Sequence, residues 1–254
     1  MSRLSLPFAA LAAALFLTAS PLAAQSAPMT DAERTEFGDA VRAYLMENPE
    51  VIFEAVAEFE RRTAEAQSGM DATLVEINSD EIYLDTHSWV GGNPDGDLTL
   101  VEFMDYRCSF CRRAFPEMVD FVDGDSNIRV VIKEFPILGP QSDVMSRFAV
   151  SVLQNGSDAQ YYESHERLIT WDGDFTETSA RLLAAELGLD ADTVVEHMNT
   201  PAVDEVLRAN RELAQRLQIS GTPTFVMGAG DSGELLRGYL PADQLVEIAA
   251  RLRG

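Results

Sequence analysis

Two cysteines in one short motif are the residues of this chain with the clearest capacity for chemistry. Cys108 and Cys111 are the only cysteines among the 254 residues, and they have the C-x-x-C spacing. The apolar run at 98–104 predicts a buried strand before them, and residues 112–122 follow with a helical pattern. A cysteine pair between a strand and a helix is typical of thiol–disulfide redox chemistry.

The place of each cysteine at the predicted helix start suggests its role. The first turn of a helix has unpaired N–H groups and the positive dipole end, which favour a thiolate on Cys108. Cys111 lies one turn further on, where it can attack a mixed disulfide formed at Cys108. Zinc needs about four ligands, and the three histidines have no ligand spacing. We therefore expect no metal and no cofactor beyond the pair, although two thiolates can hold Cu(I) incidentally.

The net charge of the chain limits its binding partners, and the N-terminal residues indicate its location. A net charge of −23 argues against nucleic acid and anionic membrane surfaces as partners. Residues 1–24 predict a signal peptide, with Arg3, an apolar core and a small-residue end. Because that core is too short to span a bilayer, we expect an exported, soluble protein. The bacterial periplasm, where disulfides persist, fits best.

Residues 28–70 predict two helices ahead of the redox motif. Thr30 begins a capping box, and Asn48–Pro49 predicts the start of a second helix over about 49–67. This second helix is apolar around most of its circumference, so it must be buried on more than one face. It either docks on the chain's own core or mediates self-association. We favour self-association, because the segment lies outside the redox unit.

Residues 71–254 predict one α/β domain. The second helix is expected to end at 67–69, a short strand is expected at 82–84, and turn formers at 91–96 lead into the central strand. A second buried strand is predicted at 127–135, which implies a right-handed parallel crossover. A helical insertion at about 140–200, a hairpin of strands 222–227 and 234–237, and a closing helix at 243–252 complete the prediction.

Three stretches together resemble the DsbA-like branch of the thioredoxin superfamily. They are Val101-Glu-Phe-Met-Asp-Tyr-Arg-Cys-Ser-Phe-Cys111, Val131-Ile-Lys-Glu-Phe-Pro-Ile-Leu-Gly139 and Ile219-Ser-Gly-Thr-Pro-Thr-Phe225. Tyr44-Leu-Met-Glu-Asn-Pro-Glu-Val51 is similar to the oligomerising segment of the suppressor-of-copper-sensitivity C proteins. The resemblance implies a thioredoxin-like α/β fold with a helical insertion and an N-terminal helical extension.

The resemblance also implies roles for single residues. Cys108 would be the exposed nucleophile and Cys111 the resolving cysteine. Pro223, after Thr222, would be a cis-proline facing them, and the backbone there would pair with a client segment as an added strand. Glu102, six residues before Cys108, matches the buried acid that relays the proton of Cys111. A partly exposed acid at the strand end is the alternative for Glu102.

The dipeptide between the cysteines departs from the best-known oxidant of this branch. It is Ser109–Phe110, without histidine or proline. Ser109 can donate a hydrogen bond to a thiolate and Phe110 cannot, so we expect a less oxidising couple, and we expect both residues to contact clients. Lys133, the only lysine, is expected to pair with Glu102 or to lie on the surface. His165 and His197 are expected on helix surfaces or in a groove.

The sequence thus predicts an exported thiol–disulfide oxidoreductase. Its partners would be unfolded or misoxidised cysteine-containing proteins and a membrane redox partner of unknown identity. The direction, oxidase or isomerase, stays open, with a lean toward an oligomeric isomerase or reductase that self-associates through residues 30–67. The alternative is a periplasmic Cu(I)-binding copper-tolerance protein that uses the same cysteine pair.

Overall fold

The computed structural model describes residues 29–254, which form two compact units. Within residues 29–58, the first unit holds α1 (Asp31–Glu47) and the first residues of α2 (Glu50–Ile77). The second unit, Phe59–Gly254, holds the rest of α2 and every strand that the structure describes. The predicted signal peptide at 1–24 lies outside the described residues.

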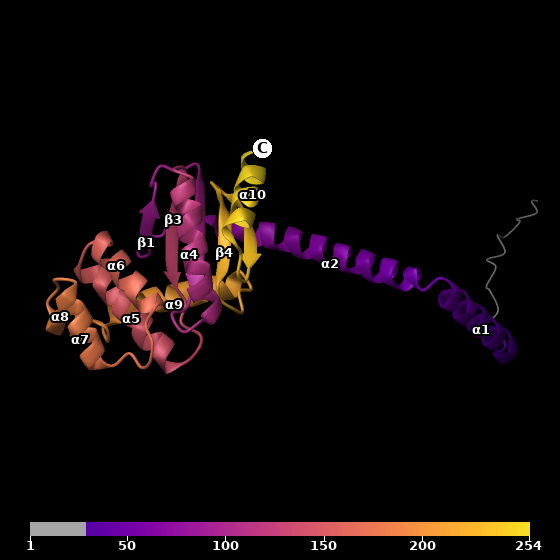
Figure 1. Ribbon diagram of the computed structural model, residues 1–254, viewed down its shortest axis with the longest axis horizontal. Helices are drawn as coiled ribbons and strands as arrows, with labels where there is room; N and C mark the ends of the chain where they lie inside the picture. The colour runs from indigo at the N-terminus through magenta and orange to yellow at the C-terminus, as the bar shows by residue number, and fades with distance from the viewer. Residues whose placement is uncertain (1–28) are drawn as a thin grey trace, which may run out of the picture. The chain divides into compact units, whose positions relative to one another are not determined.

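Five strands of the second unit form one mixed sheet (Figure 1). In sheet order they are β1 (Trp89–Gly92), β3 (Ile128–Glu134), β2 (Leu98–Met104), β4 (Thr224–Ala229) and β5 (Ser232–Arg237). β2 and β3 are parallel and are joined by α4 (Ser109–Gly124), as the sequence predicts, while the other pairs are antiparallel. All seven residues of β2 are buried, which is typical of a central strand covered on both faces.

Helices cover both faces of this sheet. The helical insertion comprises α5 (Pro140–Asn155), α6 (Asp158–Ile169), α7 (Glu177–Glu186) and α8 (Ala191–His197). The larger core packs α4, the insertion and α10 (Ala242–Arg253) on one face. A smaller core packs the end of α2, α3 (Ser79–Tyr83) and α9 (Pro201–Arg216) on the other.

The alternation of side chains along β2 decides what can meet the cysteines. Leu100 and Met104 lie in the larger core with Cys111, whereas Val101 and Phe103 lie in the smaller core. Since successive strand residues point to opposite faces, Glu102 points to the larger core. In the parallel register Lys133 is paired with Phe103, so it points to the opposite face from Glu102.

Three predictions of local structure are wrong. α2 continues through 67–69 to Ile77, because a glycine inside a helix costs only about 1 kcal/mol and Gly69 has open space around it. Residues 82–84 are not a strand, since Ile82 and Tyr83 end the helix α3. Part of the predicted turn at 91–96 is strand β1. A side chain at Gly91 would overlap the Trp89 ring, so glycine there serves close packing.

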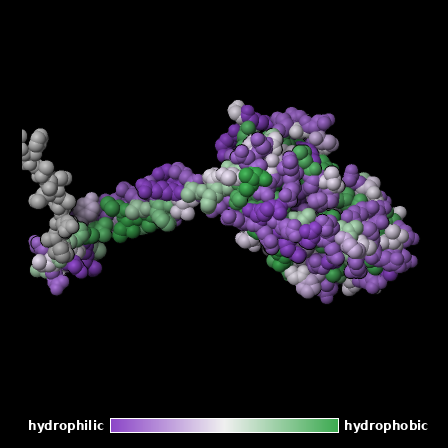
Figure 2. Space-filling view, turned by 180° about the vertical axis from the view of Figure 1, so that it is seen from behind, coloured by the Kyte–Doolittle hydropathy of each residue, from purple (hydrophilic) through white to green (hydrophobic). Residues whose placement is uncertain are grey.

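The N-terminal helices carry many exposed apolar side chains. Thr30 caps α1 with the predicted capping box, and α1 has no buried residue. Phe53 is 75% exposed, Phe59 is 70% exposed and Met46 is 72% exposed. Figure 2 shows the corresponding hydrophobic surface on these helices. Side chains of this size are usually covered in a soluble protein, so their exposure on these helices is unusual.

Candidate active site

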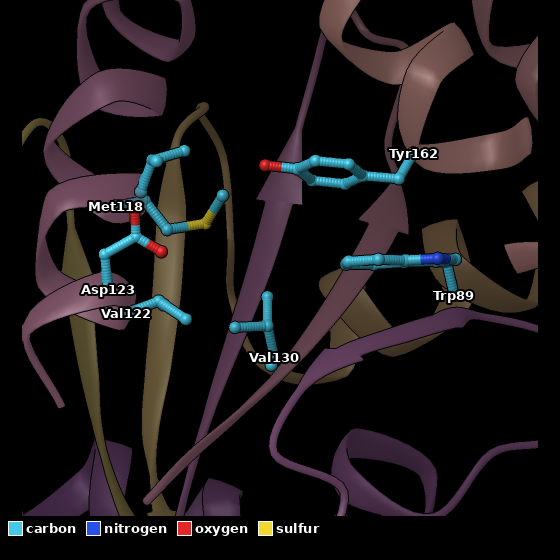
Figure 3. Close-up of a pocket in the computed structure, with 8 residues that line it drawn as sticks. Trp89, Met118, Val122, Asp123, Val130 and Tyr162 are labelled. Atoms are coloured by element: carbon cyan, nitrogen blue, oxygen red, sulfur yellow. The ribbon is translucent and has the colours of Figure 1, made fainter. Parts of the chain in front are cut away.

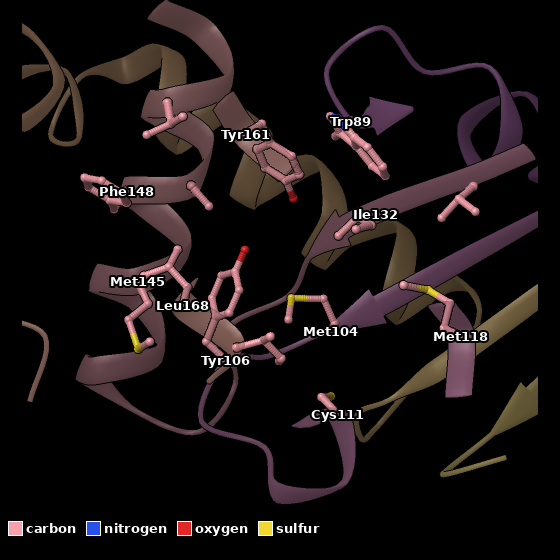
Figure 4. Close-up of a cluster of buried hydrophobic side chains, with 14 of the residues drawn as sticks. Trp89, Met104, Tyr106, Cys111, Met118, Ile132, Met145, Phe148, Tyr161 and Leu168 are labelled. Carbon is pink, nitrogen blue, oxygen red and sulfur yellow. The ribbon is translucent and has the colours of Figure 1, made fainter. Parts of the chain in front are cut away.

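Both cysteines lie at the start of α4. Cys108 is the N-cap residue, and Cys111 lies in the first turn. Both are free thiols in this structure. Cys111 is 1% exposed and Cys108 is 6% exposed, so the first cysteine is less exposed than the resemblance implies. Cys108 is nevertheless the more exposed of the two, although both cysteines belong to the larger core, in which Figure 4 shows Cys111.

The loop before β4 meets Cys108. The Thr222–Pro223 peptide bond is cis, and the Cys108 thiol donates a hydrogen bond to the Thr222 carbonyl oxygen over 3.1 Å. Two further hydrogen bonds hold the loop: Thr224 Oγ1 donates to the Gly221 carbonyl over 2.8 Å, and the Gly238 N–H donates to the Pro223 carbonyl over 2.9 Å. The fold thus brings together segments that are 114 residues apart in the chain.

Glu102 is a buried acid on the Cys111 side of the sheet. It is 2% exposed, so the alternative of a partly exposed acid is wrong. Burial, together with the charge of Glu134, raises the pKa of Glu102 to about 8. Burial, and next the charge of Glu102, raise the pKa of the Cys111 thiol well above its usual range. A carboxyl with a pKa of about 8 is ionised in part of the molecules near neutral pH, and in that form it can take the proton that a nearby thiol must lose.

Ser109 and Phe110 lie on the exposed rim of the site. Both residues are exposed. The guanidinium carbon of Arg113 lies 4.3 Å from the centre of the Phe110 ring and 5.5 Å from that of the Tyr239 ring. The rim therefore offers aromatic faces and a cation to whatever approaches Cys108.

Asp105 is a structural residue of the site that the sequence analysis misses. Its fully buried carboxylate accepts hydrogen bonds from the N–H groups of Arg107, Ile137 and Leu138 over 2.8 to 3.0 Å. Its carbonyl oxygen also accepts the Cys108 N–H over 3.0 Å. An aspartate after a strand signals a local turn, but no sequence signal reveals that it also fixes the loop after β3.

Two expectations about charged and polar residues are wrong. Lys133 is fully buried, donates to the Glu81 carbonyl over 2.9 Å and pairs with the Asp85 carboxylate. It therefore neither meets Glu102 nor lies on the surface. His165 is also buried, with Nδ1 3.0 Å from the Tyr106 hydroxyl, instead of lying on a helix surface. His197 is partly exposed, and its Nε2 lies 2.6 Å from Gln154 Oε1.

An apolar groove of about 290 Å³ lies apart from the cysteines (Figure 3). Its walls include Trp89, Met118, Val130 and Tyr162. Met118 is seven residues along α4 from Cys111, or about 10 Å of helix. The groove is therefore not part of the redox site. Within residues 29–254, no cluster of three or more His, Cys, Asp or Glu side chains could hold a metal ion.

The comparison with known families decides the relationship. The DSBA-like thioredoxin domain matches residues 99–250, a range that includes both cysteines and the Thr222–Pro223 bond. This chain belongs to the DsbA-like thioredoxin family. This membership agrees with the class of enzyme predicted from the sequence, a thiol–disulfide oxidoreductase. Residues 33–66 of this DsbA-like chain also match the family described as the copper resistance protein ScsC N-terminal domain.

Solved structures agree with the family. A thioredoxin-like oxidoreductase from Silicibacter pomeroyi DSS-3 is 38% identical, with a TM-score of 0.62 over 69% of this chain and 98% of its own. A linker-deletion mutant of Proteus mirabilis ScsC is 26% identical, with a TM-score of 0.65 over 90% and 98%. Salmonella enterica Typhimurium BcfH is 27% identical, with a TM-score of 0.71 over 88% and 97%. The thioredoxin-like fold and the kinship with ScsC are thus confirmed.

The curated relatives are much longer proteins. The Na(+)/H(+) antiporter NhaA 1 of Salinispora arenicola is 27% identical over 138 residues, which is 54% of this chain and 21% of the antiporter. NhaA 3 of Salinispora tropica is matched over 24% of its length. The DsbA-like chain therefore spans about a fifth to a quarter of these relatives. No helix in residues 29–254 combines the length and apolarity needed to cross a membrane.

Proposed function

We propose that this protein catalyses thiol–disulfide exchange on cysteine-containing client proteins through Cys108 and Cys111. One arrangement carries the proposal. A helix-capping thiol contacts the Thr222 carbonyl, a second thiol is buried one turn further along the helix, and a buried acid lies on the same side of the sheet. The first sulfur is placed to meet a client, and the second is kept for the reaction inside the protein.

The reaction balances in two steps. The Cys108 thiolate attacks a client disulfide, so a bond forms between Cys108 and one client sulfur, while the other client sulfur leaves as a thiolate. Cys111 then gives its proton to Glu102 in its ionised, carboxylate form and attacks the Cys108 sulfur, which forms the Cys108–Cys111 disulfide and releases the second client thiolate. The client gains two electrons and the cysteine pair loses two. The reverse sequence oxidises a client dithiol.

The client would bind across the rim of the site. An extended segment can pair with the backbone beside Thr222 and Pro223 as an added strand. Phe110, which is 49% exposed, and Ser109 would contact its side chains. Extended binding of this kind selects unfolded or misoxidised proteins, because folded clients seldom present a free strand next to a cysteine.

The N-terminal helices would join several copies of the chain. Ile52 and Val56 are 50% and 49% exposed, in addition to the more exposed Phe53 and Phe59. Burial of each such side chain contributes roughly 1.5–3 kcal/mol, so a second copy that covers residues 30–67 would be strongly stabilised. Several redox sites facing one client suit an isomerase or reductase better than an oxidase, and this is the direction that we favour.

Location and redox partner complete the proposal. The pattern at 1–24 favours export to the periplasm. A similar structure from Salmonella enterica serovar Typhimurium, 25% identical with a TM-score of 0.58, is described as a periplasmic thioredoxin-like protein. A membrane redox partner of unknown identity would return the cysteine pair to its working state after each cycle.

The decisive experiment refolds a substrate with scrambled disulfides. We expect the mature protein to restore its native disulfides, and Cys108→Ser to abolish this rescue. Cys111→Ser should still attack and should accumulate a mixed disulfide with the substrate. Full rescue by Cys108→Ser would overturn the proposed function. Oxidation of a dithiol peptide without rescue of the scrambled substrate would identify an oxidase instead.

A copper-tolerance function is the second candidate. It is favoured by two free thiols in one motif and by the match of residues 33–66 to a family described as a copper resistance protein. Two thiolates suffice for Cu(I). Titration of the reduced protein with Cu(I) distinguishes the candidates. Stoichiometric binding together with absent exchange activity would establish the copper function in place of the exchange function.

A further inference from the structure

Glu134 is a buried acid that the exchange steps above do not use. It lies at the end of β3 and is 3% exposed. Its Oε1 atom accepts hydrogen bonds from the hydroxyls of Tyr106 over 2.7 Å and Tyr161 over 2.8 Å. Figure 4 shows these two hydroxyls pointing into the same space between α6 and the sheet. An acid with two dedicated donors has a fixed place in the core.

When Glu134 is ionised, only one arrangement of hydrogen-bond donors and acceptors fits the residues around it. Both tyrosines then donate to Oε1, so the Tyr106 oxygen can only accept from His165 Nδ1–H, 3.0 Å away. Burial lowers the pKa of His165 to about 3, so the ring stays neutral. The proton that titrates in this cluster therefore belongs to Glu134 itself. Burial raises the pKa of Glu134 to about 7, although the hydroxyl of Ser146 and those of the two tyrosines hold it down.

Glu134 also lies next to a small polar cavity. The cavity measures about 10 Å³, near the minimum for one water molecule, and its walls include Glu134, Ser88, His87 and Asn210. Glu134 Oε2 and Ser88 Oγ are both buried and have no hydrogen-bond partner within 3.5 Å among the described residues, and the buried Ser146 hydroxyl also interacts with Glu134. Two unpartnered oxygens on the walls of one water-sized cavity form a site for a bridging water. His87, whose side chain is 31% exposed, leads from there to solvent.

Glu134 lies close enough to Glu102 across the sheet to affect its ionisation. In the parallel register Glu102 is paired with Ile132, and Met104 is paired with Glu134. The two acids are therefore on neighbouring strands, two residues apart along the strand direction, and their side chains lie on the same face of the sheet. The charge of Glu134 is a cause of the raised pKa of Glu102. Asp105 is the acid whose charge raises the pKa of Glu134. The nearby charged pair of Lys133 and Asp85 involves a lysine on the opposite face.

We propose that Glu134 is a positioning acid for Glu102: the two carboxyls share the proton that leaves Cys111, and Glu134 passes it to solvent through the cavity at Ser88. This inference rests on the proposed exchange function. When Cys111 attacks, its proton moves to Glu102. Glu102 can release that proton again only if a second acceptor lies inside the same dry core, and Glu134 is the acid placed there. No electrons are involved in this transfer.

The test uses the two release steps of 5,5′-dithiobis(2-nitrobenzoate) with the reduced full-length mature protein. The first coloured thiolate leaves when Cys108 attacks the reagent, and the second leaves when Cys111 resolves the mixed disulfide. The second rate, followed against pH, reports the acid that receives the Cys111 proton. A missing first release would contradict the exchange function itself, so the two proposals fail in different ways.

Glu134→Gln is the decisive variant. It removes the charge and keeps the shape, so Glu102 should ionise at lower pH, and the midpoint of the second step should fall by about one pH unit. The first step should keep its rate. Glu166→Gln is the matched control, because it removes an exposed carboxylate from the helix that supplies Tyr161, and it should leave the midpoint in place. An unchanged midpoint in folded Glu134→Gln would overturn the proposal.

Two further variants keep the inference falsifiable. Tyr161→Phe removes one hydrogen bond from the Glu134 carboxylate, so Glu134 stays neutral to higher pH and the midpoint should fall by a smaller amount. If Glu134→Gln does not fold, an unmoved midpoint in Tyr161→Phe overturns the coupling. Ser88→Val fills the cavity, so the second step should slow several-fold without a shift of its midpoint. An unchanged rate in Ser88→Val would exclude the exit through this cavity.

Discussion

Replacement of Glu102 by glutamine should change how the stability of this protein depends on pH. The carboxyl has an ordinary pKa of 4.5, and burial with the nearby Glu134 charge raises it to about 8 in the folded chain. The protonated group therefore contributes its stability in full below pH 4.5, and this contribution is lost as the pH rises through about 8. The glutamine variant keeps the shape and cannot ionise.

The size of the effect follows from the two pKa values. In the unfolded chain, pH 7 lies about 2.5 units above the pKa of the carboxyl, which is therefore ionised, while in the folded chain the carboxyl is still mostly protonated at this pH. At about 1.4 kcal/mol per unit, this is roughly 3 kcal/mol. Between pH 4 and pH 7, the free energy of unfolding of the wild type should thus fall by roughly 3 kcal/mol relative to Glu102→Gln.

Urea unfolding of the reduced protein at a series of pH values measures this difference. Protein concentration must be constant, because self-association would alter the apparent stability. Glu166→Gln, an exposed acid on α6, is the control and should track the wild type. A difference between wild type and Glu102→Gln that stays flat from pH 4 to pH 8 would refute the assignment of Glu102 as a buried, proton-carrying acid.

Three other substitutions test separate parts of the structure. Asp105→Ala leaves the N–H groups of Ile137 and Leu138 without their acceptor, so the free energy of unfolding in urea should fall by about 2–3 kcal/mol. Lys133→Met leaves the Asp85 carboxylate unpaired in a largely buried site and should cost about 3–5 kcal/mol in the same assay, whereas a neutral result would show the pair to be dispensable. Phe53→Glu places a charge on the exposed apolar helix and should lower the mass measured by light scattering, while rates at Cys108 with a small reagent stay constant.

The elements nearest the cysteines could be predicted because their signals are local. The strand before Cys108 begins and ends where its apolar run does, and the helix after it follows from its periodicity. The hairpin near the C-terminus follows from glycines between two strand patterns. By contrast, strand β1 is hidden in a glycine run, because Gly91 accommodates the Trp89 ring, and that contact is visible only in three dimensions.

The partners of buried polar residues could not be predicted from the sequence. Alternation along a strand gives the face of a residue, and it would have separated Glu102 from Lys133 only if the register of β2 and β3 were known. The register is set by long-range packing. The cluster of Glu134, Tyr106, Tyr161 and His165 combines residues from β3, the loop after β2 and α6, and no short-range pattern connects them.

The burial of Lys133 has a practical consequence for experiments on this protein. It is the only lysine of the chain, and its ammonium group is enclosed between Asp85 and the Glu81 carbonyl. Acylating reagents that modify ε-amines would therefore find no accessible side chain on the native surface. Incorporation of such a label at this position would count molecules that have opened globally, and this provides an internal probe of unfolding without any engineered residue.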